Sequence, residues 1–168
     1  MDEIKFIKDY LDRYNKSLFE IDISEKILKM KNLLLDVKKN NKKVIVAGNG
    51  GSAAMASHIA VDFTKQGKIR TINFNEADLI TCFANDYGYE NWIEKAIEFY
   101  GDEGDKVILI SSSGNSKNIV NAAKKAKELG IYVIGFSGFS YDNLLAKNSE
   151  LSFWVDSKAY NIVENTHQ

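Results

Sequence analysis

The sequence predicts a parallel α/β fold, because short apolar segments alternate with helical patterns along most of its 168 residues. Three of the apolar segments are continuous, as strands buried on both faces of a sheet are, and they lie at 44–47, 107–110 and 132–136. Two further segments, 69–74 and 151–155, are weaker and more alternating, which is typical of edge strands. Helical patterns separate these strands, at 52–65, 76–84, 90–100, 116–129 and 141–147. This order predicts right-handed crossovers and a three-layer α/β/α sandwich with a five-stranded parallel sheet.

Two helices are expected before the sheet, over residues 1–40. The first carries apolar side chains at spacings of three and four, which places them on one face of the helix. That face either packs on the sheet or forms an interface between copies of the chain. Because the two helices offer more apolar surface than one small domain needs, the interface is favoured. The residues of this stripe are Ile4, Ile7, Leu11, Tyr14 and Leu18.

The second helix is expected to open with Asp22 and Glu25 as a capping box. The chain is then interpreted as one domain, 1–168, in which the helical pair precedes an α/β core at 43–168. Residues 159–168 resemble the opening of a further helix, and no C-cap signal follows Gln168. We therefore expect that the natural helix continues and that this chain is cut short.

Composition limits the kinds of partner and the compartment. The net charge is −1, which gives no electrostatic basis for binding nucleic acid or a membrane. The single cysteine, Cys82, cannot form an internal disulfide, so a reducing cytoplasm is expected. Cys82 lies in the apolar run 79–83, which favours a buried structural thiol over a nucleophile. No apolar stretch approaches the roughly 20 residues of a membrane span.

The first strand ends in a glycine loop, Gly48-Asn49-Gly50-Gly51-Ser52, which opens a helix. Small residues allow a ligand close to the backbone, and the unpaired N–H groups of a helix N-terminus favour an anion. Two alternatives stay open: a plain strand-to-helix turn, and the dinucleotide fingerprint, which Gly48-x-Gly50-x-x-Ala53 satisfies. The fingerprint also needs an acidic residue roughly 20 positions on, and Asn75 and Glu76 come late for it.

The third strand ends in a serine loop, residues 111–116, which also runs into a helix with Ser116 in the N-cap position. Hydrogen bonds to a charged acceptor contribute about 1.5–3 kcal/mol each, so several hydroxyl groups can hold a phosphate without lysine. In a parallel sheet both loops lie at the edge where ligands bind. The pair predicts a small phosphorylated sugar rather than a dinucleotide, and no nucleotide cofactor is expected. The alternative is a polar turn with a capped helix.

The two loops, together with Asn85-Asp86-Tyr87-Gly88, resemble the sugar isomerase (SIS) domain family, and more narrowly its phosphoheptose isomerases. The resemblance covers nearly the whole chain. It implies a flavodoxin-like sandwich, a homotetramer with sites between subunits, and isomerisation of sedoheptulose 7-phosphate for the heptose of lipopolysaccharide or capsule. It also allows a second reading, since a bacterial regulator shares the scaffold: a protein that binds a sugar phosphate without turnover.

The resemblance assigns roles to residues of this chain. The phosphate would be held by the loop hydroxyls, and Asp86 would bind sugar hydroxyls. The alternative for Asp86 is a turn residue between Asn85 and Gly88. His58 matches a zinc ligand in some members, and its alternative is a core or interface histidine. The substrate-binding set is Asn49, Gly50, Gly51, Ser52, Asp86, Ser111, Ser112, Ser113 and Ser116.

The catalytic residues depart from the family pattern. Asp62 stands where the family has glutamate, and Glu164 where it usually has glutamine. His167 matches a neighbour of the catalytic histidine, whose position would fall beyond Gln168. An arginine that often binds phosphate is replaced by Lys65 or Gln66.

Isomerisation through an enediol needs a base and an acid, for which the candidates are Asp62, Glu164 and His167. His58 and Asp62 share one helix face, as do Glu164 and His167. If the two faces met, they would surround the sugar, and His58, Asp62 and Glu164 would be ligands for Zn²⁺. The alternatives are that Asp62 is a solvated helix residue and that Glu164 and His167 are simply exposed near a frayed helix end. With the last helix cut short, we expect sugar-phosphate binding with weak turnover.

Overall fold

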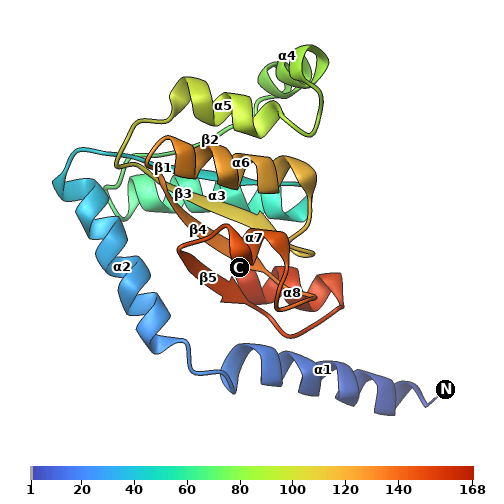
Figure 1. Cartoon of the computed structure of the whole chain (residues 1–168). Coiled ribbons are helices and arrows are strands. Elements are labelled where there is room, and N and C mark those ends of the chain that lie inside the picture. Colours follow the sequence, from blue (N-terminus) through green and yellow to red (C-terminus); the bar gives the residue numbers. More distant parts are fainter. Residues whose placement is uncertain (1) are drawn as a thin grey trace.

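The computed structural model describes residues 2–168, which form a five-stranded parallel sheet between helical layers (Figure 1). The strand order is β2-β1-β3-β4-β5, and every neighbouring pair is parallel. The chain runs from β1 outward to β2 and then returns to place β3 on the other side of β1. The order therefore reverses beside β1, which is where an open α/β sheet binds ligands. The strands are β1 (Val44–Gly48), β2 (Thr71–Asn73), β3 (Lys106–Ser111), β4 (Tyr132–Ser137) and β5 (Leu151–Trp154).

This architecture confirms the predicted sandwich, including the assignment of the two edge strands. The three continuous apolar segments are the three central strands, and all residues of β1 and β3 are buried. β2 and β5 are short and less buried than the central strands: β2 is half-buried throughout, and β5 alternates between buried and half-buried residues.

Helices cover both faces of the sheet. One face packs on α5, α6 and α7, with α4 against α5, and the other on α2 and α3. Residues of α8 also contact the second face, since the ring of His167 packs edge-on against Phe136. The core helices are α3 (Gly51–Lys65), α4 (Ala77–Tyr87), α5 (Trp92–Tyr100), α6 (Lys117–Glu128), α7 (Leu144–Lys147) and α8 (Tyr160–His167).

The two N-terminal helices, α1 (Glu3–Phe19) and α2 (Ser24–Lys39), differ in how they pack on the rest of the chain. The C-terminal half of α2 packs on the sheet through Met30, Leu34 and Val37. By contrast, α1 projects from the body and has no buried residue, and its chief neighbour is α8 (Figure 1). The alternative in which the stripe of α1 packs on the sheet is therefore wrong.

The predicted capping box at the start of α2 is also wrong. The helix begins at Ser24 with Ile23 in the N-cap position. The carboxylate of Asp22 instead accepts a hydrogen bond from the Ser24 N–H at 2.9 Å, within the turn that precedes the helix. This bond holds the pKa of Asp22 below its usual value. Among residues 2–168, no helix combines the length and the apolar character needed to cross a bilayer.

Candidate active site

A polar cavity of about 110 Å³ opens at the carboxyl edge of the sheet, between the two predicted loops. Because β1 and β3 are neighbours, with Gly48 paired to Ile110, the glycine loop and the serine loop face each other. Hydroxyl and amide groups dominate the lining, together with one carboxylate. The residues that line this pocket, called here the serine pocket, are Asn49, Ser52, Ile110, Ser111, Ser112, Ser113, Ser116, Tyr160 and Glu164.

The glycine loop brings the backbone of α3 close to the end of β1. A Cβ atom on Gly48 would lie 2.6 Å from the Cβ atom of Ser52, so a side chain there would push the first turn of α3 away. Gly50 has a φ of 55°, in the left-handed region that glycine adopts without strain. As a result, Ser52 is almost fully buried and its hydroxyl lines the serine pocket.

The serine loop is a tight turn fastened to its neighbours. The Gly114 N–H donates to the Ser111 carbonyl at 2.9 Å, and the Gly114 carbonyl accepts from the Leu145 N–H at 2.8 Å. Ser111 and Ser116 are joined hydroxyl to hydroxyl at 3.2 Å. Ser116 occupies the N-cap position of α6 as predicted, but its side chain does not cap the helix. These hydroxyl groups are therefore held together at the rim of the pocket.

The serine pocket is suited to an anion without a basic side chain. None of the residues that line it is Lys or Arg. Its positive character comes from the N-termini of α3 and α6, whose first N–H groups lack intrahelical partners and whose dipoles favour negative charge. With the serine hydroxyls, these groups can surround a phosphate with neutral donors. This geometry is the one that the two loops predicted.

Glu164 is the carboxylate that the fold brings to this pocket. It projects from α8 toward the serine loop, and its Oε1 accepts a hydrogen bond from the Ser112 hydroxyl at 3.3 Å. It also lies against the start of α3, since a Cβ atom on Gly51 would be 3.0 Å from Glu164 Oε2. Glu164 therefore lines the serine pocket between the serine loop and the start of α3.

His167 does not join Glu164, although the two are three residues apart on one helix. Its ring points toward β4, where Nε2 donates to the Ser137 carbonyl at 3.1 Å, and it packs against Phe136. Within residues 2–168, Nδ1 has no hydrogen-bond partner. Burial lowers the pKa of His167 to about 4, so the ring is neutral at pH 7. Within one chain the structure therefore does not bring His167 into the serine pocket beside Glu164, and its ring packs against β4. A catalytic role for His167 stays a prediction.

His58 and Asp62 form a separate pair on α3. His58 Nε2 lies 3.4 Å from Asp62 Oδ2, and the two side chains are 66% and 52% exposed. His58 is thus not a core histidine. His58 comes seven residues after Gly51, the residue against which Glu164 lies. It is therefore about 10 Å further along α3 than the part of the helix that Glu164 contacts.

The predicted zinc ligands His58, Asp62 and Glu164 are consequently not gathered in one chain. Across the described residues, no three His, Cys, Asp or Glu side chains are close enough to hold a metal ion. A zinc site built on these residues would need ligands from another subunit.

Asp86 lies on α4, outside the serine pocket. Its carboxylate accepts from the Asn85 amide at 2.9 Å and lies 3.8 Å from the Cys82 sulfur. Cys82 is exposed, so the expectation of a buried thiol is wrong. The run 79–83 forms an amphipathic helix that packs on α5, and Cys82 lies on the outer side of that helix.

The sequence interpretation missed three residues near the pocket. Tyr160 lines it from the start of α8, while Asn118 and Tyr89 hydrogen-bond to Asn49. Asn118 is 3% exposed, which is unusual for an asparagine. The available signal was its place two residues after Ser116, in the first turn of the helix that the serine loop opens.

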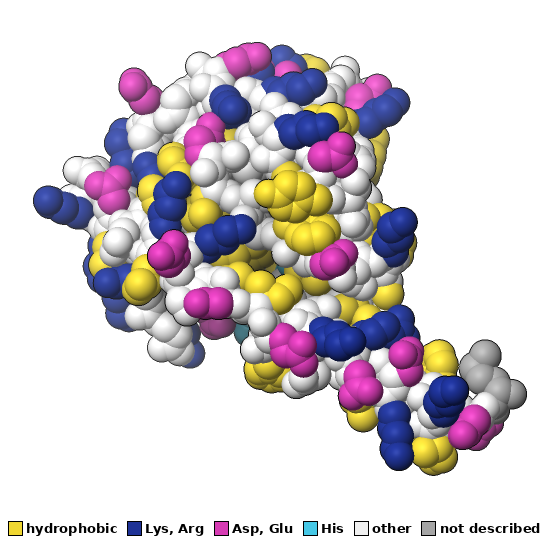
Figure 2. Space-filling view, turned by 60° about the horizontal axis from the view of Figure 1, so that its bottom comes forward, with side chains coloured by type: hydrophobic (Ala, Val, Ile, Leu, Met, Phe, Trp, Pro, Cys, Tyr) yellow, Lys and Arg dark blue, Asp and Glu magenta, His cyan; other side chains and the backbone are white. Residues whose placement is uncertain are grey.

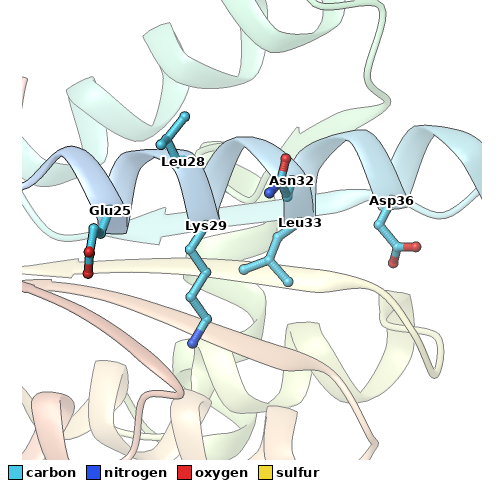
Figure 3. Close-up of a pocket in the computed structure, with 6 residues that line it drawn as sticks. All are labelled: Glu25, Leu28, Lys29, Asn32, Leu33 and Asp36. Atoms are coloured by element: carbon cyan, nitrogen blue, oxygen red, sulfur yellow. The ribbon is translucent and has the colours of Figure 1, made fainter.

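A larger hollow of about 500 Å³ runs along α2, but it lacks the features of an active site. All six side chains that line it come from this one helix (Figure 3). They include one lysine, Lys29, and two carboxylates, Glu25 and Asp36, and neither of the two loops contributes to it. It is an open helix surface, and the serine pocket remains the site that the fold constructs.

Comparison with known proteins gives the class of the chain. Residues 9–138 match the model of the SIS domain. The chain therefore belongs to the SIS domain family. Its curated relatives include a phosphoheptose isomerase of Clostridium acetobutylicum, 40% identical over 141 residues, which cover 79% of this chain and 70% of the relative. A phosphoheptose isomerase of Fusobacterium nucleatum is 32% identical over 172 residues, covering 99% of this chain and 88% of the relative.

Solved structures agree with the sequence relatives. A phosphoheptose isomerase from Neisseria gonorrhoeae superimposes with a TM-score of 0.87 at 26% identity, over 99% of this chain and 93% of that one. The two N-terminal helices and the sheet are therefore shared along almost the full length of both proteins. The resemblance stated from the sequence is confirmed.

Proposed function

We propose that this protein is an isomerase that converts sedoheptulose 7-phosphate into an aldoheptose 7-phosphate. The observation that carries the proposal is the serine pocket, in which a cradle of neutral phosphate donors borders the carboxylate of Glu164. Relatives up to 40% identical are named phosphoheptose isomerase, which supports this substrate class.

The proposed binding mode places the phosphate among the serine hydroxyls at the two helix N-termini. Ser52 and Ser111 supply hydroxyls from the two facing loops, and Ser113 and Ser116 complete the serine loop. Hydrogen bonds to an ionised acceptor are about twice as strong as neutral ones, so the cradle can hold a dianion. Binding of the phosphate in this cradle then fixes the direction in which the carbon chain of the bound sugar extends from the pocket.

The proposed chemistry gives Glu164 the role of base. Its carboxylate removes a proton from C1 of the ketose, the C1–H electron pair forms a C1–C2 double bond, and the carbonyl oxygen takes a proton from a pocket donor. The Glu164 carboxyl then returns its proton to C2 of the enediol, while the O1–H proton goes back to the pocket donor, and the C1–O1 bond becomes the carbonyl of the aldose. Because one carboxylate carries the proton between two carbons, that proton can exchange with solvent.

The remaining predicted site residues are proposed to act between subunits. His58, Asp62 and Asp86 are exposed and lie outside the pocket of their own chain. In a homotetramer, a second copy would bring such side chains to the open side of the serine pocket. Zinc, if it is used, would bind there, and metal analysis of the purified protein with His58→Ala as the comparison tests this.

The wider role follows from the proposed substrate. An aldoheptose 7-phosphate would supply heptose for lipopolysaccharide or capsule, and the reaction would take place in the cytoplasm. A binding protein without turnover is the alternative. The observation that favours it is that the phosphate cradle is complete in one chain, whereas Asp62 and His58 lie outside it.

A direct assay separates these functions. Sedoheptulose 7-phosphate is incubated with the protein and conversion is followed by NMR, with binding measured in parallel by calorimetry. We expect both binding and appearance of the aldose. The double variant Ser113→Ala/Ser116→Ala should lose binding by about 100-fold or more, because each of the two lost bonds to a charged acceptor is worth about 1.5–3 kcal/mol. Binding without any conversion by the parent protein would support the alternative.

A further inference from the structure

The side-chain amide of Asn49, in the glycine loop, is hydrogen-bonded to the side-chain amide of Asn118, which lies outside the serine pocket. Its Nδ2 donates to Asn118 Oδ1 at 3.0 Å, and Asn118 Nδ2 donates back to Asn49 Oδ1 at 2.9 Å. Asn118 belongs to the first turn of α6, is 3% exposed and is not among the residues that line the pocket. The pair therefore joins the glycine loop to the helix that follows the serine loop.

The backbone fixes the direction of this amide pair. Two facing amides make the same two hydrogen bonds if both are turned over, so the pair alone leaves the orientation open. The Ile119 N–H, however, is shared between the Ser116 carbonyl and Asn118 Oδ1, each at 3.0 Å, and a backbone N–H can only donate. The atom that it contacts must be oxygen, so Asn118 directs its nitrogen to Asn49 Oδ1.

A third contact occupies the oxygen of Asn49. The Tyr89 hydroxyl donates to Asn49 Oδ1 at 3.1 Å, and with the Asn118 bond it uses both lone pairs of that atom. One Nδ2 hydrogen of Asn49 is engaged by Asn118. Only the second Nδ2 hydrogen of Asn49 is left to face the serine pocket, so Asn49 is a hydrogen-bond donor in the pocket and not an acceptor.

We infer that Asn118 is a positioning residue that holds the Asn49 amide as a hydrogen-bond donor toward an acceptor oxygen of the sugar phosphate. The inference rests on the proposed function for the identity of the ligand. Neither loop could provide this orientation by itself, because the fixed hydrogen bond comes from the first turn of α6. Asn118 therefore affects substrate binding without touching the substrate.

The test is a double-mutant cycle on kcat and KM for sedoheptulose 7-phosphate. Asn49→Ala should raise KM by about 10-fold, the effect of losing one hydrogen bond to a charged or strongly polar acceptor. Asn118→Ala should raise KM similarly with a smaller change in kcat, because it removes binding shared by substrate and transition state. In the Asn49→Ala background, Asn118→Ala should add less than 2-fold, since its effect passes through Asn49.

Asn118→Asp is the second variant, in case Asn118→Ala fails to fold. It keeps the acceptor for Ile119, and a carboxylate in the first turn of a helix is favoured by the dipole, so the fold should persist. It replaces the donor that faces Asn49 Oδ1 with an acceptor, and we expect KM to rise by 10-fold or more.

Asn121→Ala is the matched control. Asn121 lies on the same helix and donates to the Glu90 carbonyl at 3.0 Å and to Asn91 Oδ1 at 3.1 Å, away from the pocket. It should lower thermal stability with KM unchanged. Parental KM in a folded Asn118→Asp protein, or full additivity of the cycle, would overturn the inference. Absence of turnover in the parent protein would instead overturn the proposed function.

Discussion

Among the three predicted catalytic residues, Glu164 alone lines the serine pocket. Asp62 is half exposed on α3 and His167 faces β4, whereas Glu164 hydrogen-bonds to the serine loop. Glu164→Gln should therefore lower kcat by about 10²-fold or more, the usual contribution of a general base, with sugar-phosphate binding retained. Glu25→Gln, at a carboxylate on α2 outside the serine pocket, is the matched control, measured in the same NMR assay. An equal loss in both variants would show that the base is not specific to the serine pocket.

The burial of His167 makes stability depend on pH. The pKa of its ring is about 4 in the folded protein, because burial disfavours the charged form, and about 6.5 when unfolded. Above pH 6.5 both states hold a neutral ring. Below pH 6.5 the unfolded chain binds a proton at this ring that the folded chain does not bind. About 3 kcal/mol of the free energy of unfolding is therefore lost as the pH falls from 6.5 to 4.

Urea unfolding at several pH values tests this contribution. His167→Gln keeps a donor for the Ser137 carbonyl and removes the titrating ring, so its free energy of unfolding should fall less between pH 6.5 and 4 than that of the parent. His58→Gln is the control, since the His58 side chain is 66% exposed. Parallel curves for the parent and His167→Gln would contradict the assigned cause.

The loops are the elements on which binding depends, and Gly114 tests how tightly the serine loop is packed. Gly114 has a φ of 66°, and a Cβ atom on it would lie 2.0 Å from Oδ1 of the buried Asn143. Gly114→Ala should therefore cost about 1 kcal/mol for the backbone conformation and about 1–3 kcal/mol more for overpacking.

Gly104→Ala is the matched comparison, measured by thermal unfolding. Gly104 has a φ of 87°, but its nearest neighbour is the end of the flexible Lys42 side chain at 3.2 Å. It should show the backbone cost without the packing cost, and sugar-phosphate binding should weaken only in Gly114→Ala. Equal destabilisation of the two variants would mean that Asn143 moves aside freely.

The elements were largely predictable from the sequence because their signals are local. Continuous apolar runs identified the central strands, and the glycine and serine clusters identified both loops. The capping box failed because Ile23 takes the N-cap position, one residue after Asp22. That Glu164 faces the serine pocket whereas His167 faces β4 could not be read from their spacing, since the orientation of both depends on how α8 lies against Gly138. A Cβ atom on Gly138 would be 2.6 Å from Val163, so the helix packs closely there.

At the scale of the whole molecule, α1 is the least explained part of a single chain. Hydrophobic side chains are exposed on this projecting helix and on the adjoining surface of the body (Figure 2). Ile4, Ile7 and Leu11 are each more than half exposed, and they lie on one face. Exposed apolar patches of this kind mark surfaces for association.

The proposed homotetramer can be tested on this face. Ile7→Lys/Leu11→Lys should convert the assembly into a smaller species in light scattering, because two charges would be placed within an apolar interface. Lys5→Glu, on the polar side of α1, should leave the assembly intact. A parent protein that is monomeric at all concentrations would contradict the proposal, and with it the placing of His58, Asp62 and Asp86 at a site between subunits.

Proton transfer at the serine pocket is measured most directly by deuterium exchange. Sedoheptulose 7-phosphate is incubated in D₂O with the parent protein and with Glu164→Gln, and incorporation at C1 and C2 is followed by NMR and mass spectrometry. We expect incorporation by the parent protein, and binding with at least 10²-fold slower incorporation by the variant. A parent protein that binds the sugar phosphate without incorporating deuterium, or a variant that matches the parent, would contradict the assignment of Glu164 as the base.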